Sequence, residues 1–343
     1  MKPIKPGMEQ WTALMASQLA ATLLLIVSPA LPAQSKSPTS PAKKTMGEIR
    51  VLHFPATQAC GQLYFIPMPF RDPRGNEEWK SITPAKGDIK VAVPPGQGIL
   101  LELNKKVIDE PQWLEKVSPE GIDGLREQYI GMDENEQKIP DRLMDFIPHL
   151  KNLNVLIISR SDVTDKSLPK IASLKKLDWL EATGTTIHGT NFKDLLNLPN
   201  LTHLDFGFST IDRNNLTYLA RLPRLKMLCL DNAQINAESI NFLADSPSIE
   251  TLSISNNLAL DDRSIPALLR MKKLKNLHLN GTSISLHSVK KLSALNLESL
   301  TLPNQVKKTD LPELQKLFKK TNLVIFHKHV NQEENALFEP ITR

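Results

Sequence analysis

Cysteine, glycine and aromatic residues are all scarce in this chain of 343 residues, which contains 2 Cys, 14 Gly and 5% Phe, Trp and Tyr. Two cysteines cannot build the disulfide framework on which small secreted scaffolds depend. The excess of positive charge is also small, because 42 basic and 37 acidic residues leave a net charge of only +5, spread along the chain. This balance excludes a nucleic-acid-binding stripe. An apolar share of 41% excludes both a wholly disordered chain and a multi-span membrane protein.

The first 33 residues have the pattern of a secretory signal peptide. Two lysines come early, an apolar stretch runs over Leu14–Val27, and small residues follow up to Ala33. The apolar stretch is shorter than the roughly 20 residues that a spanning helix needs. We therefore predict export to the periplasm, cell envelope or exterior, with cleavage near Ala33; an uncleaved anchor is the alternative. Residues 34–46 follow as a linker rich in Pro, Ser and Lys.

Export would place Cys60 and Cys229 in a compartment where disulfides form. They lie in what look like two different domains. We predict two buried or free thiols, with a bridge between the domains as the alternative.

Residues 47–112 are predicted to form a small antiparallel β domain. Apolar and polar residues alternate there with the period of half-buried strands. Four strands are expected, at residues 49–54, 62–68, 89–93 and 99–103. The last two flank the turn Pro94–Gly98, so we expect them to pair as a hairpin.

The second half of the chain repeats itself in steps of 24 residues, with one step longer and one shorter by a residue. Each unit opens with the pattern L-x-x-L-x-L. The middle leucine of that pattern is Leu156, Leu180, Leu204, Leu228, Leu252, Leu277 and Leu300 in the successive units. Three apolar residues at a spacing of three follow, which is typical of a short helix or helical turn. Good N-cap residues stand just before that stretch in five units, at Thr164, Asp212, Asn236, Asp261 and Ser285.

The repeat resembles the leucine-rich-repeat family, in the variant that exported bacterial proteins contain. The resemblance covers about Ile122–Phe326 and includes seven strand motifs. It implies a right-handed α/β horseshoe with a parallel sheet on the concave face and short helices on the convex face. A single unit buries too few side chains to fold alone, so the units must stack. We assign residues 113–326 to this solenoid with terminal caps, and residues 327–343 to a polar tail.

The side chains on either side of the middle leucine should point away from the core, onto the concave face. Large apolar groups that should face solvent stand beside acids there, as at the centre of an interface. Our candidate contacts are Trp179, Glu181, His203, Asp205, Phe208, Met227 and Asp231. The acids favour a basic or amine-bearing partner, or a polar glycan. The alternative is that Trp179 packs under an N-terminal loop and the acids are only solvated.

Two other functions deserve comparison. Glu181 and Asp205, one strand apart, match the carboxyl spacing of retaining glycosidases, but an open sheet offers no water-excluding pocket. Envelope glycan binding, with Trp79, Tyr64 and Phe65 of the β domain stacking on sugars, is the main alternative. We predict a non-enzymatic recognition protein that binds a protein or peptide, with no cofactor, no metal site, no nucleic-acid partner and no membrane domain beyond the signal segment.

Overall fold

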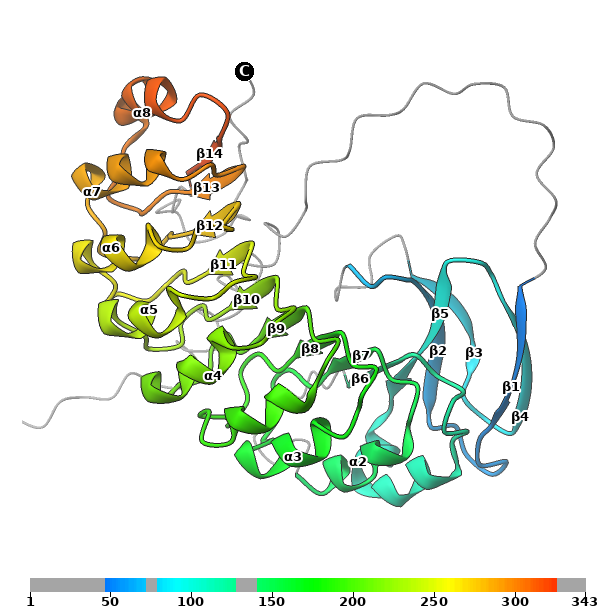
Figure 1. Cartoon of the computed structure of the whole chain (residues 1–343). Coiled ribbons are helices and arrows are strands. Elements are labelled where there is room, and N and C mark those ends of the chain that lie inside the picture. Colours follow the sequence, from blue (N-terminus) through cyan, green and yellow to red (C-terminus); the bar gives the residue numbers. More distant parts are fainter. Residues whose placement is uncertain (1–46, 72–78, 128–140, 326–343) are drawn as a thin grey trace, which may run out of the picture.

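The computed structural model describes residues 47–71, 79–127 and 141–325 (Figure 1). The predicted signal peptide, the linker and the polar tail lie outside the described residues. Within the described ranges, no helix is both long enough and apolar enough to cross a membrane.

One curved sheet forms the frame of the described chain. In spatial order its strands are β3 (Lys80–Pro84), β2 (Gly61–Pro67), β5 (Gln97–Leu103), β6 (Gly124–Glu127), β7 (Val155–Ile157), β8 (Trp179–Glu181), β9 (His203–Asp205), β10 (Met227–Cys229), β11 (Thr251–Ser253), β12 (Asn276–His278), β13 (Ser299–Thr301) and β14 (Asn322–Val324). From β5 to β14 every neighbouring pair is parallel, whereas β2 pairs antiparallel with both β5 and β3.

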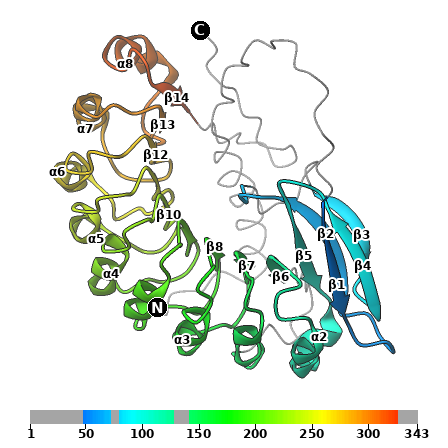
Figure 2. The same ribbon diagram turned by 45° about the vertical axis from the view of Figure 1, so that its right-hand side comes forward.

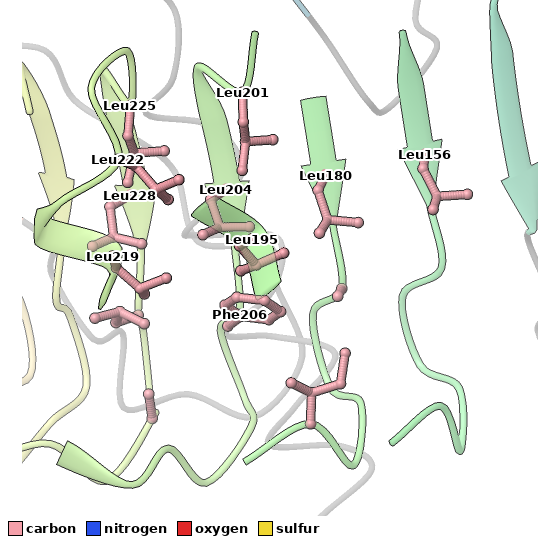
Figure 3. Close-up of a cluster of buried hydrophobic side chains, with 14 of the residues drawn as sticks. Leu156, Leu180, Leu195, Leu201, Leu204, Phe206, Leu219, Leu222, Leu225 and Leu228 are labelled. Atoms are coloured by element: carbon pink, nitrogen blue, oxygen red, sulfur yellow. The ribbon is translucent and has the colours of Figure 1, made fainter. Parts of the chain in front are cut away.

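The register of the parallel strands confirms the 24-residue period. The middle leucines of successive units are direct partners, in the order Leu125, Leu156, Leu180, Leu204, Leu228, Leu252, Leu277, Leu300 and Leu323. All of them are buried in one hydrophobic cluster, and Figure 3 shows four of them on neighbouring strands. Each unit therefore adds one rung to a single stack. The first and last rungs, β6 and β14, lie outside the seven strand motifs of the sequence.

Short helices cover the outer side of the horseshoe (Figure 2). The α-helices are α2 (Lys105–Asp109), α3 (Leu168–Ile171), α4 (Leu216–Ala220), α5 (Ala237–Leu243), α6 (Ile265–Leu268), α7 (Leu286–Lys291) and α8 (Leu311–Leu317). The 3₁₀ turns are η1 (Pro111–Lys116), η2 (Leu143–Asp145), η3 (Ile147–His149), η4 (Asp165–Ser167), η5 (Phe192–Asn197), η6 (Arg213–Asn215), η7 (Asp262–Ser264), η8 (Leu292–Ala294) and η9 (Lys308–Asp310). A strand of three residues leaves most of each unit for these turns.

The five predicted N-cap residues all cap a helix or turn. In each case the side-chain oxygen accepts a hydrogen bond from a backbone N–H two or three residues further on. Asn236 also forms a capping box with Ser239. The unit that has His188 at this position instead has Asn191 as the N-cap of its turn η5, without a side-chain hydrogen bond.

The predicted hairpin is wrong. Strand β4 (Asp88–Val93) pairs with β1 (Glu48–His53) in a separate two-stranded sheet, and β5 pairs with β2 and β6. The reason is burial. Residues 98–101 are buried on both faces of β5, so this strand lies inside the large sheet with a partner on each edge, whereas β4 alternates between buried and exposed residues.

Asp123 connects the N-terminal strands to the solenoid. Its Oδ2 accepts hydrogen bonds from the backbone N–H of Ile99 at 2.7 Å and from Nη1 of Arg50 at 2.6 Å. Its Oδ1 accepts one from Nδ2 of Asn152 at 2.7 Å. Asp123 is only 5% exposed, so these contacts satisfy a buried carboxylate. They link β1, β5 and the turn before β7.

Both thiols are buried and free, as predicted. Burial raises the pKa of Cys60 to about 11 and raises that of Cys229 well above its ordinary value. Both cysteines are therefore protonated and unreactive at neutral pH.

A candidate ligand-binding face

The inner face of the sheet is built from two rows of side chains that flank the buried leucines. The first row is Val155, Trp179, His203, Met227, Thr251, Asn276 and Ser299, and the second is Ile157, Glu181, Asp205, Cys229, Ser253, His278 and Thr301. Because the leucines point toward the helices, these two rows point to the concave side. Five of the seven predicted contacts, Trp179, Glu181, His203, Asp205 and Met227, lie in these rows on the neighbouring rungs β8, β9 and β10. Phe208 and Asp231 lie shortly after strands β9 and β10.

The prediction that Trp179 faces solvent is wrong. This residue is 5% exposed, and its ring meets that of Phe70 edge-on at a centroid distance of 5.0 Å. The ring of His203 is also stacked on the Trp179 ring, at a centroid distance of 4.3 Å. Phe70 follows strand β2, so the alternative interpretation, packing under an N-terminal loop, is the observed one. The cluster around Trp179 contains Ile66, Phe70, Leu100, Val155 and Ile157.

Met227 is also buried, with 7% of its surface exposed, contrary to the prediction. Its row is crowded, since His203 and Thr251 are its direct partners on both sides and the sheet curves inward. His203 is half-buried, and burial lowers its pKa to about 4, so the ring is neutral at pH 7. Phe208 is half-buried and belongs to neither hydrophobic cluster.

The three predicted acids are bound to their own fold. Oε1 of Glu181 accepts a hydrogen bond from Ser159 at 2.8 Å, and Oδ1 of Asp205 accepts one from the N–H of Gly207 at 2.7 Å. Oδ1 of Asp231 accepts bonds from the next rung, namely from the hydroxyl of Ser253 at 2.7 Å and the N–H of Ser255 at 2.6 Å. They are neither simply solvated nor free counter-charges for a basic partner.

Two of these carboxyl groups have raised pKa values. Burial, with the nearby charge of Asp205 adding to it, raises the pKa of Asp231 to about 7. Burial also raises the pKa of Asp205. The Cys229 thiol lies on the same rung as Asp231 and is hydrogen-bonded to Asp205. The negative charge of this part of the face is therefore smaller than the residue types suggest.

The aromatic residues of the β domain lie at the N-terminal end of the sheet. The rings of Tyr64 and Trp79 are 5.9 Å apart, and the guanidinium of Arg126 lies over Trp79 at 5.0 Å. Arg126 also pairs with Glu102 at 3.5 Å. Phe65, on the opposite face of β2, packs against the main core instead, so it is not available for stacking on a sugar.

A third row, which includes the predicted contact Phe208, follows the strands, and its backbone conformation was not predicted from the sequence. Its residues are Arg160, Gly184, Phe208, Asn232, Asn256 and Gly281, and each has a left-handed backbone with φ between 50° and 70°. We call this the αL row. In the first five units the backbone N–H of this residue donates to a carbonyl of the next rung, at 2.7–2.8 Å. Glycine or asparagine stands at four of the six positions, and this pattern could have predicted the left-handed backbone from the sequence.

Comparison with known proteins gives matches at the level of structure. No protein-family model matches the sequence, and no curated protein matches it. Among solved structures, an internalin (inlF) from Listeria monocytogenes is 21% identical over 54% of this chain and 55% of its own, with a TM-score of 0.41. An internalin C2 (inlC2) from the same organism is 19% identical over 51% of this chain and 72% of its own, with a TM-score of 0.38. The match thus spans about half the length of the first structure.

The stacked leucine rungs of the chain itself decide the fold. The chain folds as a leucine-rich-repeat solenoid. In this solenoid the short helices lie on the outer side of the curved sheet (Figure 2). The strand registers place the two inner rows on the other face of the sheet. Within the described ranges, no group of three or more His, Cys, Asp or Glu side chains is arranged to hold a metal ion.

Proposed function

We propose that the protein is an exported, non-catalytic recognition protein that binds a protein or peptide on the concave face of its leucine-rich-repeat sheet. The observation that carries this proposal is the pair of inner rows. They present polar and apolar side chains from seven consecutive rungs, and the helices of the described chain lie on the other side of the sheet (Figure 2). Side chains that are fixed by their neighbours lose little entropy when a ligand docks.

The contact set proposed from the sequence divides into two groups in this geometry. Trp179, Met227 and Asp231 are buried and support the face from below. His203, Asp205 and Phe208 are half-buried and reach its surface, and Glu181 lies at the border between the two groups with 9% exposure. We propose that the half-buried residues touch the ligand, together with Thr251 and Asn276 of the first inner row.

Site-specific photo-crosslinking tests this proposal in the cells that make the protein. A photoreactive amino acid is placed at Thr251 on the concave face or at Lys193 on the convex turn η5, both of which are accessible. We expect a discrete crosslinked protein from position 251 only. The variant Thr251→Arg should abolish capture by a probe at Asn276, because a long charged side chain fills the face. Equal capture from both positions would mean that the concave face is not the binding surface.

Glycan binding remains the second candidate, and the N-terminal end of the sheet favours it. Tyr64 and Trp79, with the adjacent Arg126–Glu102 pair, combine aromatic surface with planar polar groups, which is the chemistry that binds sugars. A pull-down with purified cell-wall polymer compares the wild type with Tyr64→Ala and Trp79→Ala. Binding that both variants lose, while the crosslink from position 251 is absent, would favour this candidate over the first.

A further inference from the structure

The αL row contains two residues that its backbone disfavours. Glycine and asparagine adopt the left-handed conformation readily, whereas a long or bulky side chain is strained there. Arg160 has a φ of 59° and Phe208 a φ of 56°. Gly184 stands between them, and the later units have Asn or Gly. The backbone N–H at this position donates a hydrogen bond to the next rung whether the residue is Arg160, Gly184 or Phe208, so this bond does not depend on the side chain.

Neither side chain makes a contact within the described fold that would offset the strain. Arg160 is exposed, and its guanidinium has no ion pair or hydrogen bond to any described residue. Phe208 is half-buried but contributes to neither hydrophobic cluster. Strained residues that do not serve packing are typical of functional positions.

Arg160 and Phe208 share one backbone position on two rungs of the solenoid. They occupy equivalent positions with nearly equal φ on alternate rungs, about 10 Å apart at the usual strand spacing. Gly184 lies between them without a side chain, and a Cβ placed there would meet no atom closer than 3.9 Å, at Arg160. Gly184 therefore places no side chain between the positions of a cation and an aromatic ring, and we call these three neighbouring positions the notch.

We propose that this notch, made by Arg160, Gly184 and Phe208, selects a peptide segment in which a carboxylate stands next to an apolar side chain. The guanidinium binds the carboxylate, and the phenyl ring packs against the apolar group. The charge of the site supports an acidic ligand, because Glu181, Asp205 and Asp231 bond their own fold, while the Arg160 guanidinium has no partner among the residues that the structure describes. The proposal rests on the concave-face function and names the ligand class for it.

The test uses an array of synthetic peptides with a central Glu-Leu or Glu-Phe pair, and a matched array with Gln in place of Glu. We expect the full-length protein to prefer the Glu peptides about tenfold, the usual size of one charge-assisted bond. Arg160→Gly should abolish this preference, and Phe208→Gly should weaken binding to both arrays. Asn256→Gly, the same backbone change two rungs beyond Phe208, should leave binding unchanged.

Stability provides the independent measurement. If Arg160 and Phe208 are strained for function, both glycine variants should keep the thermal midpoint or raise it by about 2–4 °C. A lower midpoint in both variants would mean that the residues serve the fold, and the proposal would be wrong. It would also be wrong if the Gln peptides bound equally well, or if light scattering showed that the variants alter the oligomeric mass, since a second copy would then occupy the notch. Normal crosslinking at position 251 with any of these results would leave the proposed function standing.

Discussion

Asp231 shows how a polar residue of the inner face titrates. The carboxyl group is fully buried and accepts its bonds from the following rung. Its pKa is about 7 in the folded protein, against an ordinary 3.8. Because the folded state binds this proton more tightly than the unfolded state, the free energy of unfolding falls as pH rises from about 4 to about 7, and the effect is complete above that range.

We therefore expect Asp231→Asn to be more stable than the wild type at pH 8 and nearly equal to it at pH 4.5. The amide preserves the acceptor oxygen for Ser253 and Ser255 but carries no charge. Urea unfolding across this pH range measures the effect. Glu120→Gln, on an exposed residue, is the control and should follow the wild type. A wild-type and a variant profile that run in parallel would show that Asp231 does not titrate there.

Asn257 compensates for the missing polar side chain of Ala233, which stands at a position where the other units have a polar residue. The sequence places Ser, Thr or Asn at the same point of each unit, except for Ala233. Oδ1 of Asn257 accepts from the N–H of Ala233 at 3.0 Å and of Ile235 at 3.2 Å, and Nδ2 donates to the carbonyl of Leu230 at 2.9 Å. The longer amide therefore bonds the turn of the previous unit. Hydroxyls elsewhere in the column, as in Ser161, bond mainly a carbonyl of their own turn.

At the level of elements, acids at the start of one convex turn cap the next turn. Asp141 accepts bonds from the N–H of Thr164 at 2.8 Å and from the hydroxyl of Ser167 at 2.5 Å. Asp165 does the same for the N–H groups of His188 and Gly189, and Asp262 bonds the N–H and hydroxyl of Ser285. Short turns of three to six residues cannot satisfy their own first N–H groups, so a neighbour's carboxylate stabilises them.

Loss of one of these cross-turn caps should weaken the contact between two rungs. Burial would raise the pKa of Asp141, but the bonds from Ser167 and Thr164 outweigh it and lower the pKa. Its stabilisation is thus present above about pH 4 and is lost as pH falls further. We expect Asp141→Ala to cost about 1 kcal/mol at pH 7 and less at pH 3, measured by urea unfolding. Lys166→Ala, an exposed change in the same turn, should cost nothing, and an equal loss in both variants would contradict the cap.

For the whole molecule, the continuity of the sheet matters more than any single contact. Strand β5 pairs with β6, so the N-terminal strands and the solenoid share one sheet and one core. The strands β2 and β3 thus cover the edge that the first rungs of a solenoid would otherwise expose. Asp123 adds polar contacts across the same boundary.

Removing residues 47–104 should therefore unfold or aggregate the solenoid rather than leave it intact. The deletion exposes the edge of β6 and removes part of the hydrophobic cluster to which Leu114 and Leu125 belong. Circular dichroism and size-exclusion chromatography of the fragment 105–343 measure this. The full chain should unfold in one transition when followed by both far-ultraviolet and tryptophan signals. A monomeric fragment with the thermal midpoint of the full chain would show that the two regions are independent.

Local patterns are enough to predict the rungs. A strand residue and its helix contacts lie within one 24-residue unit, so the spacing of leucines and N-cap residues already specifies which side chains are buried. The caps at Asp212 and Asn236 and the partners of Leu204 could be predicted for this reason.

Contacts between distant segments could not be predicted in this way. The pairing of β4 with β1, the join of β5 to β6 and the packing of Phe70 on Trp179 each depend on which surfaces meet after the chain has folded. The charge of the inner face could not be predicted for the same reason. The pKa values of Asp205 and Asp231 are raised because the folded chain buries both carboxyl groups away from water. Periodicity specifies what one unit does; burial and strand partners, which are properties of the assembled fold, determine the surface that a ligand meets.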